Sequence, residues 1–156
     1  MKKMLSTLAF ALLAMVAVQA QRVPKEVQQV LEQYVQILRT SESLDACAER
    51  FRSIAGGSLV EDDPVNVSLR STVKDFSLKK DFNNIRFYAN PVRISRVTTE
   101  EVTKIGSGES ALGGTIYKIW IAREDSSTGM PAPVSIIMPR NHPVIKTPKV
   151  VNIGSF

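Results

Sequence analysis

Two kinds of apolar periodicity divide this chain, and the second begins only where the first has ended. Up to about residue 80, apolar side chains recur at spacings of three and four, the period of a helix with one buried face. From about residue 85 they alternate with polar side chains, the period of a half-buried strand. This segregation predicts an α+β fold, with N-terminal helices packed on a curved antiparallel sheet of about four strands.

Three helices are expected before the sheet. The first runs from about Pro24 to Arg39, with an apolar stripe on one side and several glutamines on the other. Ser43 is placed to cap a second helix, which ends at a pair of glycines. The third helix is expected from about Val65 to Lys80, with Val73 and Phe76 on its buried side.

The first strand is expected to be long and bent, running from Ile85 to about Val97. Its apolar positions change phase by one residue at Asn90-Pro91, as they would at a β-bulge. With that bulge, Phe87 and Ile94 should both point into the core, although an odd number of residues separates them. Three further strands are expected, at 115–123, 133–138 and 149–156, joined by short antiparallel connections.

The first 20 residues have the order of a secretory signal. Lys2 and Lys3 precede an apolar run from Leu8 to Val18, and Ala20 supplies the small residue at the exit. The run is about half the length that a spanning helix needs, and no second apolar run follows it. We therefore expect cleavage after Ala20, a single domain over 21–156, and a periplasmic or secreted protein with no lipid anchor and no membrane span.

The composition excludes several kinds of site. One cysteine and one histidine rule out an internal disulfide, a cysteine-rich zinc site and paired-histidine metal motifs. Cys47 lies on the apolar stripe of the second helix and is expected to be buried, with an intermolecular disulfide as the minor alternative. His142 lies in a polar loop and is expected to be exposed. We predict no metal and no cofactor.

The order of elements resembles that of the nuclear transport factor two-like superfamily, whose SnoaL-like members are cone-shaped and similar to cystatin-like folds. The resemblance is one of layout and covers nearly all of the chain after residue 20. It is carried by the segments NNIRFYANPVRISRV, TIYKIWIAR, PVSIIM and KVVNIGSF. It implies an exported bacterial member in which the bent sheet encloses a pocket closed by the helices.

The resemblance leaves the activity open, because this fold carries enzymes, ligand-binding domains and scaffolding domains. Its isomerase-like enzymes use an Asp base deep in the cone, and no Asp or Glu falls inside an expected strand. We therefore expect a non-enzymatic domain that binds a small apolar ligand or a protein partner, with Tyr88, Tyr117 and Arg123 as ligand-binding residues. The alternative is a small isomerase or cyclase whose acid comes from a loop.

The strand at 115–123 also suggests self-association. Its first face carries Tyr117 and Ile119, and its second face carries Ile116 and Trp120, so both faces are rather apolar. We expect the first face to fill the core and the second to form a homodimer interface, with Trp120 near the centre and Ile116 beside it. The rival interpretation is that segments of the same chain cover Trp120.

A third class of function is an envelope binder of nucleic acid or of an anionic surface. It would require one exposed stripe formed by Arg86, Arg93, Arg96 and Lys104. The formal net charge of +5 does not by itself favour nucleic acid, and we predict no nucleic-acid partner.

Overall fold

The computed structural model describes residues 23–156 and confirms the α+β class. Within these residues, helices pack on a four-stranded antiparallel sheet in the order β1-β2-β3-β4. The predicted signal segment lies outside the described residues. The helices are α1 (Lys25–Thr40), α2 (Leu44–Phe51) and α3 (Lys79–Asn84), and the strands are β1 (Ile94–Ile105), β2 (Leu112–Ile121), β3 (Ala132–Pro139) and β4 (Lys149–Asn152).

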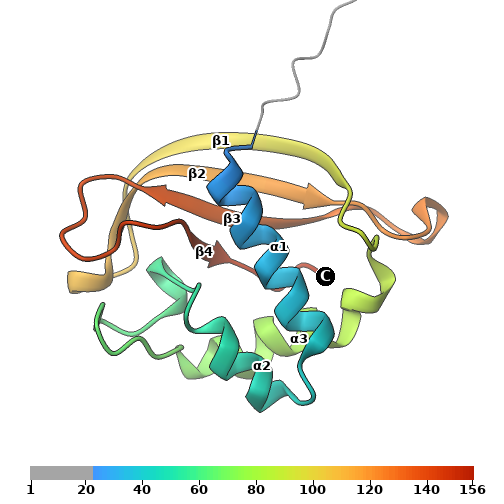
Figure 1. Cartoon of the computed structure of the whole chain (residues 1–156), viewed down its shortest axis with the longest axis horizontal. Helices are drawn as coiled ribbons and strands as arrows, with labels where there is room; N and C mark the ends of the chain where they lie inside the picture. Colours follow the sequence, from blue (N-terminus) through green and yellow to red (C-terminus); the bar gives the residue numbers. More distant parts are fainter. Residues whose placement is uncertain (1–22) are drawn as a thin grey trace, which may run out of the picture.

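Helix α1 lies across one face of the sheet (Figure 1). Its apolar stripe is almost completely buried, and Val27, Leu31 and Tyr34 are each 0% exposed. Helix α2 begins where expected, because the Ser43 side chain accepts a hydrogen bond from the backbone N–H of Ala46. In Figure 1, α2 and α3 lie beyond the β4 edge of the sheet, on the side away from β1.

The prediction of a regular third helix from Val65 to Lys80 was wrong. Residues 61–70 form a loop, and the helical run begins at residue 71 with a π-helical turn over Val73–Leu78 before α3. This wider turn places Val73 and Leu78, five residues apart, on the buried side. Phe76 is consequently turned out of the core and is 70% exposed.

The first strand also differs from its prediction. Residues 85–87 form a 3-10 turn, Tyr88 makes only an isolated bridge, and β1 begins at Ile94, after a cis Asn90–Pro91 peptide bond. Ile85 and Tyr88 are buried at helical spacing, whereas the exposed fractions of Phe87 and Ile94 are 42% and 39%. The predicted bulge and the inward orientation of these two side chains were therefore wrong.

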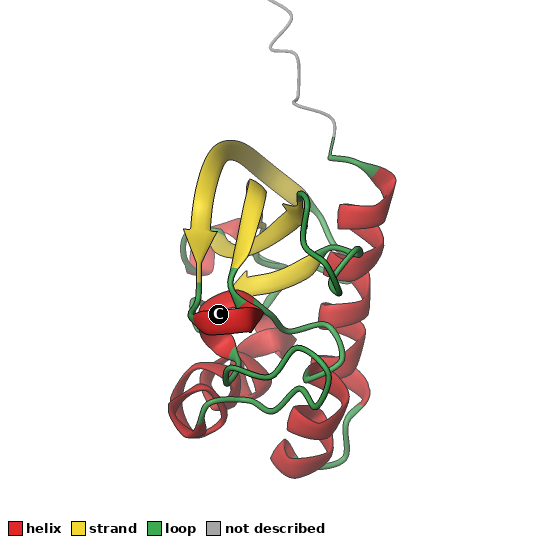
Figure 2. Cartoon of the chain, turned by 90° about the vertical axis from the view of Figure 1, so that its left-hand side faces the viewer, coloured by secondary structure: helices red, strands yellow, loops and turns green. Residues whose placement is uncertain are grey.

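The sheet is strongly curved (Figure 2), and its two faces differ as the alternation along β2 predicted. On the inner face, which faces the helices, Ile119 and Ile121 are 0% exposed and Tyr117 packs at the margin of the core. The outer face carries Lys118 and Trp120.

The last residues leave the sheet earlier than predicted. Strand β4 ends at Asn152, and Gly154 takes a positive φ of 93°, a backbone conformation that favours glycine. The chain then turns inward, so that the ring of Phe156 lies 4.5 Å from that of Tyr88 and 6.3 Å from that of Tyr34.

Candidate functional site on the outer face of the sheet

The register of β1 and β2 gathers the residues of the open part of the outer face. Arg96 pairs with Trp120, and Thr98 pairs with Lys118. Glu100 then pairs with Ile116, which completes three rows across the two strands. Along β1 this face therefore presents a cation, a hydroxyl and a carboxylate in turn.

Trp120 lies on this face, as the sequence predicted, but it is half-buried and its ring is covered by cations rather than by apolar groups. The guanidinium carbon of Arg96 lies 3.9 Å from the ring centroid, and Nζ of Lys118 lies 5.0 Å from it. Both side chains are exposed. A cation over an indole face is a favourable contact that leaves the remaining N–H donors of the cation available to an anionic partner.

Ile116 faces the same side but belongs to a second, smaller apolar cluster. This cluster is built around Leu112, Ile137 and Val151, and Ile145 of the loop after β3 packs against it. At this end of the outer face the chain covers its own apolar surface, although the rival interpretation had placed such cover over Trp120. At the Trp120 end, Arg96 and Lys118 lie over the aromatic ring instead.

Between these two ends lies a shallow hollow of about 220 Å³. Its polar lining can donate and accept hydrogen bonds, and its apolar wall comes from the second cluster. The lining residues are Thr98, Glu100, Ile105, Ile116, Lys118, Ser135, Val151 and Asn152. Such a surface suits contact with another polypeptide better than enclosure of a small apolar molecule.

The structure brings together two of the three expected ligand-binding residues. The Arg123 guanidinium carbon lies 5.2 Å from the ring centroid of Tyr88, and the backbones of these residues form an isolated bridge. Tyr117 lies six positions before Arg123, about 20 Å along an extended strand. Tyr88 is 3% exposed and packs on Phe156, so its ring forms part of the core.

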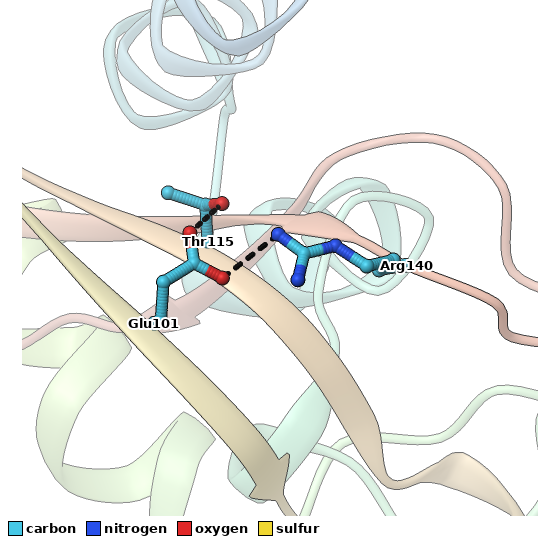
Figure 3. A network of polar contacts seen from close by, with 3 residues as sticks. All are labelled: Glu101, Thr115 and Arg140. Atoms are coloured by element: carbon cyan, nitrogen blue, oxygen red, sulfur yellow. Dashed lines mark hydrogen bonds and ion pairs between the residues drawn. The ribbon is translucent and has the colours of Figure 1, made fainter.

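A polar network that sequence reasoning did not find lies at the other end of the inner face (Figure 3). Thr115 donates its hydroxyl to Glu101, and Nη2 of Arg140 lies 2.8 Å from Oε2 of Glu101. The hydrogen bond from Thr115 and the charge of Arg140 lower the pKa of the Glu101 carboxyl. Both charged side chains are exposed, so the network orders the surface without forming a buried site.

Arg140 and His142 line an open pocket of about 560 Å³ next to this network. The expectation that His142 would be exposed was wrong, since it is 8% exposed. Its Nδ1 accepts the backbone N–H groups of Val144 and Ile145, and Nε2 lies 2.9 Å from the carbonyl oxygen of Glu109. Both ring nitrogens therefore hold loops together, which leaves neither for proton transfer to a substrate.

The candidate acid in the interior is Asp81 of α3, which the sequence did not single out. It is 0% exposed. Tyr34 donates its hydroxyl to Oδ2 over 2.6 Å, while the backbone N–H groups of Gly154 and Phe156 donate over 2.8 and 2.9 Å. Burial raises the pKa of Asp81, and these hydrogen bonds oppose that effect. Asp81 therefore anchors residues 154–156, a structural role.

Cys47 is 0% exposed, which confirms the predicted burial, and desolvation raises the pKa of its thiol to about 11. Within residues 23–156 there is no cluster of three or more His, Cys, Asp or Glu side chains that could hold a metal ion. Helices long and apolar enough to cross a bilayer are likewise absent from this part of the chain.

Comparison with protein families, with curated proteins and with solved structures finds no match for this chain.

Proposed function

We propose that this protein is an exported, non-catalytic binding domain that acts through protein–protein contact on the outer face of its sheet, with a second copy of the chain as its partner. One observation carries the proposal: Trp120 lies on that face beneath Arg96 and Lys118, and both cations are exposed. Tryptophan and arginine are among the residue types that contribute most to protein interfaces.

The charges of this face are self-complementary. In the proposed dimer the outer faces of two copies pack against each other. The two-fold axis lies between the two sheets and parallel to them, is perpendicular to β1, and passes over Thr98. Strand β1 of one copy then runs antiparallel to β1 of the other, and Arg96 lies over Glu100 of the second copy. The same operation repeats the pair on the other side of the axis, as an isologous interface requires.

The apolar residues of the face fit the same arrangement. Trp120 shares a row with Arg96, and Ile116 shares a row with Glu100. In this arrangement Trp120 lies over Ile116 of the second copy, so the proposed dimer gives both residues the interface role that the sequence predicted. The two Lys118 side chains approach each other at the axis, and each keeps its ammonium near Trp120, 5.0 Å from the ring centroid.

The structure gives less support to a small ligand or to catalysis. Tyr88 is used in core packing, and Tyr117 lies far along the strand from Arg123. The buried carboxylate of Asp81 has its oxygens occupied by three internal donors. The resemblance to nuclear transport factor two-like domains agrees with helices on a curved sheet, and export depends on the signal-like residues 1–20.

Sedimentation over a concentration series tests the proposal. The native chain should form a dimer, and Trp120→Glu should be a folded monomer, because a charge buried in an interface is costly. Val144→Glu is the matched control: Val144 is 52% exposed and lies in the loop after β3, so this variant should still dimerise.

A native chain that is monomeric at every concentration, or a Trp120→Glu variant that remains a dimer, would overturn the proposal. Arg96→Glu provides a second variant if Trp120→Glu fails to fold. Arg96 is exposed, so its replacement changes the charge of the face without opening a cavity.

A further inference from the structure

A second surface of unusual composition lies on the helical run over residues 71–87, away from the outer face of the sheet. Its exposed side carries two phenylalanines separated by cations. We define this surface, the basic aromatic stripe, as Phe76, Lys79, Lys80, Asn83, Arg86 and Phe87. Phe76 is 70% exposed and Phe87 is 42% exposed.

Helical spacing places these six residues on one side. Counted from Phe76, the other five residues lie three, four, seven, ten and eleven positions further along the chain. Residues at these intervals lie on the same face of a helix. Phe76 and Phe87 are roughly three turns apart, so they lie toward opposite ends of the stripe. The opposite side of the run faces the core through Val73, Leu78 and Ile85.

The π-helical turn is the reason that this stripe exists. A regular helix would have placed Phe76 with Val73 on the buried side, whereas the wider turn gives that place to Leu78. Turns of this kind are rare and are frequently found at functional sites. A single exposed aromatic side chain is ordinary, but two of them beside cations on one helical run form a surface of the kind that binds a partner.

The charged residues of the stripe itself, Lys79, Lys80 and Arg86, are positive and exposed. Two exposed acids flank it: Asp75 lies at one end, and Glu124, whose backbone N–H donates to the carbonyl oxygen of Phe87, lies at the other. Beside Phe87, the guanidinium carbons of Arg86 and Arg123 lie 4.8 and 5.5 Å from the ring centroid. The surface thus combines insertable rings with cations on the same side.

A hollow of about 440 Å³ opens along the first half of the stripe. Its lining comprises Asp75, Phe76, Ser77, Lys79, Lys80, Asn83 and Gly154. One of the ammonium groups, that of Lys80, also donates to the carbonyl oxygen of Gly154 over 3.0 Å. Two ammonium groups, an amide and a hydroxyl around this hollow can bind a phosphodiester headgroup, and they outweigh the single carboxylate of Asp75.

We propose that the basic aromatic stripe docks this protein on the surface of an anionic phospholipid bilayer. Cations attract the headgroups, and Phe76 and Phe87 enter the boundary between headgroups and acyl chains, as in interfacial amphipathic helices. An acidic polypeptide without apolar surface would satisfy the cations but would make no contact that uses the exposed rings. The contact is peripheral and requires no spanning helix.

This docking is compatible with the proposed dimer. Figure 1 shows α3 beyond the β4 edge of the sheet and β1 on the opposite side. A molecule held by its basic aromatic stripe therefore keeps the β1 side of the sheet, where Arg96 and Glu100 lie, away from the membrane.

Co-sedimentation with vesicles tests this inference, using the protein exported and processed by a bacterial host. Binding should be strong to vesicles of phosphatidylglycerol with phosphatidylcholine and weak to phosphatidylcholine alone. Lys79→Glu combined with Lys80→Glu should lower the affinity by about thirtyfold, and Phe76→Ser by about tenfold. Added salt should weaken the charge-dependent part.

Two control variants test whether membrane binding depends on the basic aromatic stripe or only on net charge and exposed apolar surface. Val65→Ser replaces another exposed apolar residue, which is 74% exposed, and Lys25→Glu with Lys104→Glu makes the same charge change elsewhere. Both should bind as the native chain does. Equal losses in the controls, equal binding to both kinds of vesicle, or binding to soluble polyglutamate that Phe76→Ser leaves unchanged would overturn the inference.

Discussion

Ile119 and Trp120 are neighbours in β2, yet they lie in opposite environments. Ile119 faces inward and is 0% exposed, within a core closed by α1. Trp120 faces outward beneath Arg96 and Lys118, with exposed charge around it. The inner face is thus completed by the chain itself, whereas the open part of the outer face presents groups that a partner can complete. Stability should depend on the first face and association on the second.

The largest effect should come from the buried carboxylate behind the inner face. Asp81→Ala removes the acceptor of three internal donors, so we expect a loss of about 3–5 kcal/mol of unfolding free energy, measured by urea denaturation. Asp75→Ala, in the same helical run but exposed, should change it by less than about 0.5 kcal/mol. Similar losses in both variants would show that the interior network is not special.

The two faces of β2 can be compared directly. Ile119→Ala should cost about 3–4 kcal/mol, because it leaves a cavity in a closed core. Lys118→Ala, one residue away on the outer face, should change the unfolding free energy by less than about 0.5 kcal/mol. The same change should strengthen the dimer, since it removes the like charges at the axis. A large loss of stability on replacing Lys118 would contradict the division into a closed face and an open one.

The pH dependence of the unfolding free energy tests the burial of the Cys47 thiol. Its thiol pKa is raised from 9.0 to about 11 because burial disfavours the thiolate. A group whose pKa is higher in the folded state stabilises the fold fully below its unfolded pKa and loses that contribution as pH rises. Stability should therefore fall between about pH 9 and 11, and Cys47→Ala should show less of this fall. An identical alkaline fall in both proteins would assign it to other groups.

Glu101 on the surface should show the smallest effect, with the opposite sign. Its pKa is lowered by Thr115 and Arg140, so its contribution is present above the unfolded pKa and is lost as pH falls through the folded pKa. Glu101→Gln should lower the melting temperature slightly at neutral pH and not at all in strong acid. A difference that persists in acid would exclude an ionic cause.

The parts that the sequence predicted correctly are those with regular periods. The stripe from Val27 to Leu38 and the alternation along β2 each repeat over several residues, so one chance match has little weight. The cap at Ser43 was also predicted correctly, from a single residue whose side chain suits that position. The apolar stripe of the second helix likewise predicted correctly that Cys47 is buried. The faces of Trp120 and Tyr117 followed from the alternation in the same way.

Most errors in secondary structure lie between residues 61 and 93, where the local geometry departs from both periods. A π-helical turn places Phe76 on the outside of the helical run. The alternating apolar residues Ile85, Phe87 and Ala89 resembled a strand, but the first two lie in a 3-10 turn. His142 and Asp81 were misjudged or missed because their partners, such as Glu109 and Gly154, are distant in sequence. No local pattern records such long-range hydrogen bonds.

The most direct test of the central claim is a charge exchange on the outer face, measured by the dimer dissociation constant. Arg96→Glu and Glu100→Arg should each weaken the dimer by at least about tenfold, because each places like charges in contact. The double variant restores the Arg–Glu pairing between copies in reverse and should recover most of the native affinity. Additive losses in the double variant, or single variants that dimerise like the native chain, would contradict the account.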